Sequence, residues 1–193
     1  MLETHQVLSL IDSNIPTIYH RQSVNDKQFC EVGVSIQKLL LDIQETKDTF
    51  PNSLFMKQEN YELAYAISKA YVLAGKNILV SSLDDIVKAK LYITNKIDEY
   101  ELDKSPQYYK QLMNNPQLLF ISDFVSETPS FDESNVNLKL YSGWEYRYLN
   151  SFIRGRLENK ELSTILYSAS DDISHCWSDL LIQIINRHVD LIL

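Results

Sequence analysis

The dipeptide Ser122–Asp123 lies near the end of the most apolar run of the chain, which reads QLLFISDF from Gln117 to Phe124. A carboxylate at the end of a buried strand can hold magnesium, and a second acid beside it can polarise a water molecule for attack on a phosphate. Here one of the two positions is an acid and the other is a serine. Asp123 is therefore interpreted either as the remnant of a metal-binding site or as a solvated strand end.

The segment after the expected strand Ser53–Lys57 is where a phosphate would bind if the chain held a nucleotide. Phosphate-binding loops use glycines to bring backbone N–H groups close, a lysine to neutralise charge and a Ser or Thr to hold magnesium. This segment reads QENY, and the whole chain has only four glycines. Glu59 would repel a phosphate. The segment is either a phosphate loop that has lost its chemistry or a strand–helix turn that never had any.

Aromatic and basic residues gather in two further segments. Core packing explains some of them, and others could form an exposed patch that contacts a protein or stacks on single-stranded bases. These candidate contact residues are Tyr108, Tyr109, Trp144, Tyr146, Arg147, Arg154 and Arg156.

An alternation of short apolar runs and helical segments must position these residues. Strands are expected over 53–57, 77–80, 117–124, 163–170 and 189–193, and helices over 60–75, 82–93, 138–160 and 171–187, the last capped by Asp171 or Asp172. This pattern predicts an α/β fold, with a five-stranded parallel sheet and helices on both faces. Gly75 is expected to end the first helix, and Ser82 with Asp85 to begin the second.

Two other stretches are assigned less regular structure. Residues 103–116 are expected to be polar and broken by prolines. Residues 1–52 form a helical N-terminal segment that packs on the core, with a short helix, an extended linker over 14–28 marked by Pro16, and a longer helix over 29–50. The α/β domain then spans 53–193.

Composition limits the classes of partner. The 193 residues carry a formal net charge of -8, so tight, autonomous DNA binding is disfavoured and protein partners are favoured. No apolar run is long enough to span a bilayer and no signal peptide is recognisable, so we expect a cytoplasmic protein that does not enter membranes. Cys30 and Cys176 lie far apart and form no paired-cysteine motif, so no metal site is expected.

Several segments resemble one family, the bacterial and phage replicative-helicase loaders of the DnaC/DnaI type, within the AAA+ P-loop ATPases. The resemblance lies in NIPTIYHRQSVND at 14–26, LAYAISKAYVLAGKNILVSSLDDIVKAK at 63–90, QLLFISDF at 117–124, WEYRYLNSFIRGRLENKELSTILYSAS at 144–170 and LLIQIINRHVDLIL at 180–193. It implies a P-loop-type, AAA+-like fold and covers the chain from about residue 15 onward.

The resemblance also implies where a nucleotide site would lie. The positions of the phosphate loop fall between Met56 and Tyr61, those of the Walker B strand end at Ser122 and Asp123, and that of sensor 1 falls at 168–170. The residues of this degenerate nucleotide site are Lys57, Glu59, Asn60, Tyr61, Ser122, Asp123, Ser168 and Ala169. Arg187 is the only candidate arginine finger beyond them. Because every position is weakened, we expect no ATP hydrolysis, no catalytic residue and no cofactor.

The resemblance then implies a non-catalytic protein of DNA replication, of phage or mobile-element type. It would act through contacts with a replicative helicase, its loader or a related AAA+ subunit, as an accessory or an inhibitor, and could form part of an oligomer. Two alternatives stay open. One is a nucleotide-binding ATPase with an unconventional site around Asp123, and the other is a single-stranded DNA-binding protein.

Overall fold

The computed structural model of the 193-residue chain describes residues 4–20, 53–57, 61–125, 143–169, 173 and 177–192. Five strands are β1 (Ser53–Lys57), β2 (Ile78–Ser81), β3 (Leu118–Val125), β4 (Ser163–Ser168) and β5 (Val189–Ile192). The helices are α1 (Thr4–Asp12), α2 (Thr17–His20), α5 (Tyr61–Leu73), α6 (Leu83–Ile93), η2 (Glu99–Glu101), α7 (Pro106–Met113), α8 (Gly143–Glu158) and α9 (Asp179–His188).

The strands form one sheet in the order β2-β3-β4-β1-β5, and every neighbouring pair is parallel. Leu54 of β1 pairs with Ile165 of β4 on one side and with Asp190 of β5 on the other. The predicted α/β class with a parallel sheet is confirmed.

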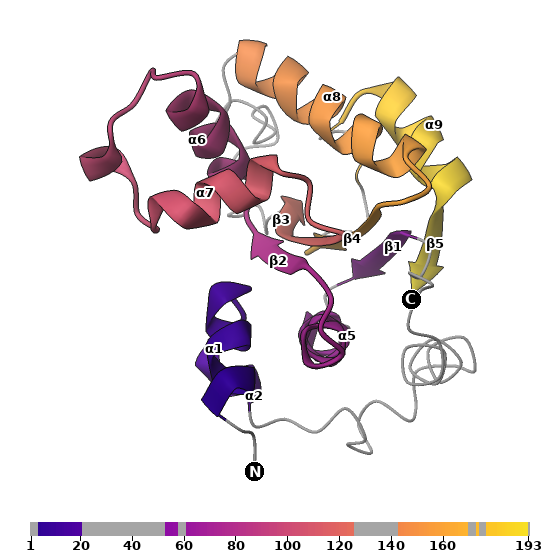
Figure 1. Cartoon of the computed structure of the whole chain (residues 1–193). Helices are drawn as coiled ribbons and strands as arrows, with labels where there is room; N and C mark the ends of the chain where they lie inside the picture. The colour runs from indigo at the N-terminus through magenta and orange to yellow at the C-terminus, as the bar shows by residue number, and fades with distance from the viewer. Residues whose placement is uncertain are drawn as a thin grey trace, which may run out of the picture.

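Helices cover both faces of this sheet (Figure 1). Helices α1, α2 and α5 pack on one face, and α6, α7, α8 and α9 pack on the other. Side chains alternate between the two layers, so Leu54 and Met56 of β1 join the core beneath α5 while Phe55 joins the core on the opposite side. A strand that is buried on both faces needs apolar residues at every position, which explains the uninterrupted apolar runs of the sequence.

Helix termini follow the local sequence signals. Ser82 and Asp85 form the predicted capping box at the start of α6, with Ser82 Oγ accepting from Asp85 N and an Asp85 carboxylate oxygen accepting from Ser82 N. After α5, Gly75 has a φ of 78°, and its N–H donates to the Val72 carbonyl. The left-handed backbone at this position explains the glycine, as predicted.

Three boundaries differ from the sequence predictions. The stretch 103–116, predicted to be irregular, contains α7. Pro106 occupies the first turn of this helix, where no backbone N–H is needed, and Ser105 is its N-cap. Helix α9 begins at Asp179 with Ser178 as its N-cap, later than predicted. The short helix α2 lies inside the predicted extended linker, directly after Pro16. The helix predicted over 29–50 lies outside the described residues.

None of the helices in the described ranges combines the length and the apolar character needed to cross a membrane.

Candidate functional site

The carboxyl ends of β1, β3 and β4 meet at one edge of the sheet. Lys57 pairs with Ser168, Ser168 pairs with Val125, and the Ala169 N–H donates to the Val125 carbonyl at 2.8 Å. The strand order thus brings together the sequence-predicted positions at the ends of β1 and β4, next to β3. Of the remaining positions, Tyr61 is the first residue of α5, and Glu59 and Asn60 lie outside the described residues.

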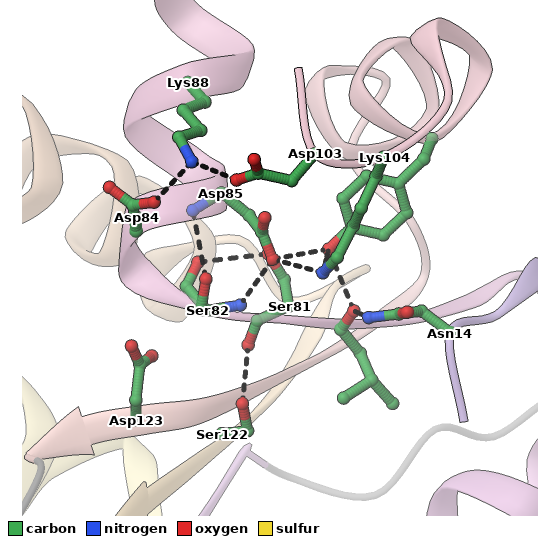
Figure 2. A network of polar contacts seen from close by, with 12 residues as sticks. Asn14, Ser81, Ser82, Asp84, Asp85, Lys88, Asp103, Lys104, Ser122 and Asp123 are labelled. Atoms are coloured by element: carbon green, nitrogen blue, oxygen red, sulfur yellow. Dashed lines mark hydrogen bonds and ion pairs between the residues drawn. The ribbon is translucent and has the colours of Figure 1, made fainter. Parts of the chain in front are cut away.

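Asp123 and Ser122 lie on β3 beneath the start of α6 (Figure 2). The Asp123 carboxylate accepts a hydrogen bond from the Leu83 N–H at 2.7 Å, and Ser122 Oγ donates to the Ser81 carbonyl at 3.2 Å. Both side chains therefore bond to the β2–α6 junction. The register of β3 against β4 shifts between Ile121 and Val125, and such an irregularity re-aims side chains near a strand end.

The Asp123 carboxylate serves as a helix-terminal acceptor. Leu83 is the first residue of α6, so its N–H has no partner within the helix and is satisfied by this carboxylate. Burial raises the pKa of Asp123 to about 6, against the lowering effect of the Leu83 N–H and with a further contribution from the negative charge of Asp85. A carboxylate in this setting stabilises α6 and is poorly placed to hold a cation.

A buried polar network lies above this junction (Figure 2). One Asp85 carboxylate oxygen accepts from Lys104 Nζ at 2.5 Å and from the Tyr108 hydroxyl at 3.1 Å. Burial raises the pKa of Asp85, but the hydrogen bond and charge of Lys104 and the contacts with Ser82 outweigh it, so the pKa stays below its ordinary value. The network links α6 to the loop before α7 and to α7 itself.

A second, more exposed group lies on the outer side of α6. Lys88 Nζ contacts both Asp103 and Asp84, the latter at 3.0 Å. These hydrogen bonds, with Asp103 contributing most, raise the pKa of Lys88. The acidic side chains of this region are thus neutralised by lysines of the same chain.

The N-terminal segment closes the edge of the sheet at β2. The Val80 N–H donates to the Ser13 carbonyl at 2.9 Å, and Asn14 Nδ2 donates to the Val80 carbonyl at 2.9 Å. The Tyr108 hydroxyl lies 3.0 Å from the same carbonyl, so its single proton is shared between this carbonyl and Asp85. Asn14 has a φ of 59°, the left-handed conformation that ends α1 and turns its side chain toward β2.

Between this segment and α6 lies an open cavity of about 640 Å³, lined by Ile11, Pro16, Tyr65, Ser82, Asp84 and Lys104, among others. Its charged groups are paired within the chain, Asp85 with Lys104 of the lining and Asp84 with Lys88 outside it, and no cluster of acidic, histidine or cysteine side chains suited to a metal occurs in the parts of the chain that the structure describes.

The predicted contact residues divide into two groups. Tyr108, Tyr109 and Arg156 were expected as possible surface contacts, but the structure buries all three, and Arg156 is 2% exposed. Their burial follows from α7, which places both tyrosines beneath α6, and from the hydrogen bonds that Arg156 donates to the Pro116 and Ser163 carbonyls at 2.8 and 2.9 Å.

The other predicted contact residues lie on α8 at or near the surface. Arg147 and Arg154 are exposed, Trp144 is 39% exposed, and Tyr146 is half-buried against Trp177 with ring centroids 6.0 Å apart. Arg187 is exposed on α9.

Sequence reasoning missed the residues that hold this region together, chiefly Asn14, Lys104 and the backbone of Leu83. A lysine close before a helix and an asparagine at a helix end carry a weak local signal. Their partners lie 19 and 66 residues away in the sequence, so only the fold identifies them.

No protein-family model and no curated protein matches this chain.

Proposed function

We propose that this chain is a non-catalytic AAA+-like protein of DNA replication, located in the cytoplasm, that acts by contacting a replicative helicase or its loader. The observation that carries the proposal is the bond between Asp123 and the Leu83 N–H at 2.7 Å. Among the described residues of the expected nucleotide site, Asp123 is the acid, and its carboxylate accepts from the first N–H of α6.

The strand order supports the P-loop-type part of the proposal. Strands β1 and β3 lie on either side of β4. A phosphate loop after β1 and an acid near the end of β3 would therefore border the same crevice, at the carboxyl edge where open parallel sheets bind ligands. In this chain, β4 ends at Ser168 and is followed by Ala169 at this edge. Ser168 pairs with Lys57, the last residue of β1. The scaffold fits a nucleotide-binding ancestor whose chemistry was lost.

The two other candidate functions find less support. An ATPase centred on Asp123 would need that carboxylate to hold a cation while one of its oxygens accepts from the Leu83 N–H, at a position where burial disfavours its charge. A single-stranded DNA-binding protein would need accessible aromatic and basic residues, and Tyr108, Tyr109 and Arg156 are buried. We therefore favour contacts with proteins.

Size-exclusion chromatography with light scattering can test the proposal on purified proteins. The full-length chain is mixed with the replicative helicase, with the loader and with both, all from the organism that encodes it. We expect a stable complex with at least one of them. Asp123→Asn should form the same complex, because the proposed contact uses no nucleotide bound to this chain. Elution of every mixture as separate components would refute the proposal.

A further inference from the structure

Helices α8 and α9 lie on the face of the sheet that α6 and α7 also cover (Figure 1). Side chains of α8 and α9, with Ser178 before α9, line a groove. It has a volume of about 240 Å³, and its walls include Tyr146, Arg147, Asn150, Arg154, Leu180 and Leu181. Arg147 and Arg154 are exposed on the α8 side. Leu180 is 53% exposed on the α9 side, while Leu181 is buried. The groove therefore combines an apolar wall with a basic rim.

One hydrogen bond links the two walls of the groove, and a second lies within α8. Ser178 Oγ donates to Asn150 Oδ1 at 2.8 Å, and Asn150 Nδ2 donates to the Tyr146 carbonyl at 2.9 Å. Ser178 also caps α9 by accepting from the Leu181 N–H. Because Asn150 and Ser178 are already hydrogen-bonded, these residues need no rearrangement when a ligand binds. A preformed site loses less entropy on binding.

The charges of the groove are one-sided. Arg147 and Arg154 are the only charged residues among the described residues that line it, in a chain with a formal net charge of -8. They are seven residues apart, which is two helical turns or about 10 Å along one face of α8. Arg154 pairs with Glu158 at 3.8 Å, but both side chains are about half exposed and such a pair is readily exchanged.

We infer that this groove docks an acidic amphipathic helix of a protein partner. Two carboxylates two turns apart on that helix would face Arg147 and Arg154, and an aliphatic side chain between them would enter the groove beside Leu180. Helices that bind in grooves are anchored by apolar residues on one face of the helix, at spacings of three, four and seven residues. The charges that flank these residues select the partner. The inference rests on the groove itself and not on which replication protein the chain contacts.

Nucleic acid fits the same groove less well. Two cations give little phosphate neutralisation, and the remaining surface of an acidic protein repels a polyanion. Stacking of bases would need a free ring, but Tyr146 already packs against Trp177, which in turn stacks on Phe124 with centroids 4.7 Å apart. The apolar side chain of Leu180 supplies neither a hydrogen-bond donor nor a positive charge to a nucleotide backbone.

The test is a charge exchange followed by fluorescence anisotropy. The probe is a labelled helical peptide of about 15 residues, long enough to form helix, with two glutamates seven residues apart and leucines between them on the same face. A second peptide has lysines in place of the glutamates, and an oligo(dT) of matching length serves as the nucleic-acid probe. The protein variants are Arg147→Glu/Arg154→Glu and, as a matched control at exposed positions elsewhere, Lys110→Glu/Lys160→Glu.

We expect the wild-type chain to bind the acidic peptide with an affinity that falls as salt is raised. The arginine reversal should weaken this binding about tenfold or more and create binding to the lysine peptide, whereas the control variant should bind as the wild type does. The proposal is overturned if the acidic peptide does not bind, if the reversal leaves its affinity unchanged, or if the groove arginines instead govern binding of oligo(dT).

Discussion

At the scale of single residues, the environment of Asp123 decides what this carboxylate can do. It lies at a strand end, where an acid could serve a metal, but the Leu83 N–H reaches it at 2.7 Å. The surrounding burial disfavours its charge, and Asp85 adds repulsion. A carboxylate that is already bonded and costly to ionise makes a poor magnesium ligand, while it remains a good acceptor for a helix terminus.

Substitution of Asp123 should separate the hydrogen bond from the charge. Asp123→Asn keeps an acceptor for Leu83, whereas Asp123→Ala removes it. The folded-state pKa of about 6 is above the unfolded value, so the contribution of this group is full at pH below 4 and is lost as pH rises through 6. We expect Asp123→Asn to gain about 2–3 kcal/mol relative to wild type at pH 8 and little at pH 4, because a rise of the pKa from 3.8 to about 6 corresponds to about 3 kcal/mol. Denaturant unfolding at both pH values measures this difference.

Asp123→Ala is the companion variant. It should lose about 1–2 kcal/mol relative to Asp123→Asn at both pH values, because the first N–H of α6 loses its partner. Equal stability of the alanine and asparagine variants would show that the bond to Leu83 contributes nothing.

The buried Asp85 should behave in the opposite way. Its folded-state pKa lies below the ordinary value, so its contribution to stability is present above pH 4 and is lost as pH falls below that. Asp85→Asn leaves Lys104 without its anion and should cost about 2–4 kcal/mol at pH 7, as broken buried pairs do. The variant should also show a flatter acid limb in its unfolding profile.

Asp84→Asn is the matched control, since Asp84 lies on the same turn of α6 and pairs with Lys88 at the surface. We expect it to cost less than about 0.5 kcal/mol. Equal losses from Asp84→Asn and Asp85→Asn in thermal or chemical unfolding would contradict the assignment of Asp85 to the buried network.

At the scale of elements, the N-terminal segment protects the edge of the sheet. Strand β2 is an outer strand, and unpaired edge groups invite pairing with other chains. Ser13 and Asn14 satisfy both backbone groups of Val80 at this edge. The end of α1 thereby acts as a cover for β2.

This cover predicts a graded effect of substitutions at Asn14. Asn14→Gly keeps the left-handed backbone but loses the bond to the Val80 carbonyl, and Asn14→Ala loses both. We expect losses of about 0.5–1.5 kcal/mol for glycine and about 1 kcal/mol more for alanine. In both, the Val80 amide should exchange its hydrogen faster than in the wild type. Unchanged exchange at Val80 would contradict the role of this segment.

The elements also show what a sequence can predict here. Capping and turn residues act locally, so Ser82, Asp85 and Gly75 marked helix ends correctly. The predicted break at Pro106 was wrong, because a proline fits the first turn of a helix and Pro106 begins α7. Strand order could not be read from local signals, and it is the order that brings β2 and α6 beside Asp123. The placement of this acid near the end of a strand was predictable, and its partner Leu83 was not.

At the scale of the whole molecule, the sheet edge and the outer surfaces differ in the groups that they present. The positions at which nucleotide chemistry would occur carry serine, alanine and a bonded carboxylate. The cavity beside the N-terminal segment contains charges that are paired within the chain. The groove between α8 and α9 presents two exposed arginines, one of them in a half-exposed pair with Glu158, beside an exposed leucine. This distribution supports the proposal that the chain binds other proteins.

Isothermal titration of the full-length chain with ATP and magnesium tests directly whether the sheet edge binds nucleotide, which the proposed function excludes. We expect no saturable heat up to millimolar ATP, and the same result for Asp123→Asn. Saturable binding at micromolar ATP that requires magnesium and is abolished in Asp123→Asn would contradict the account.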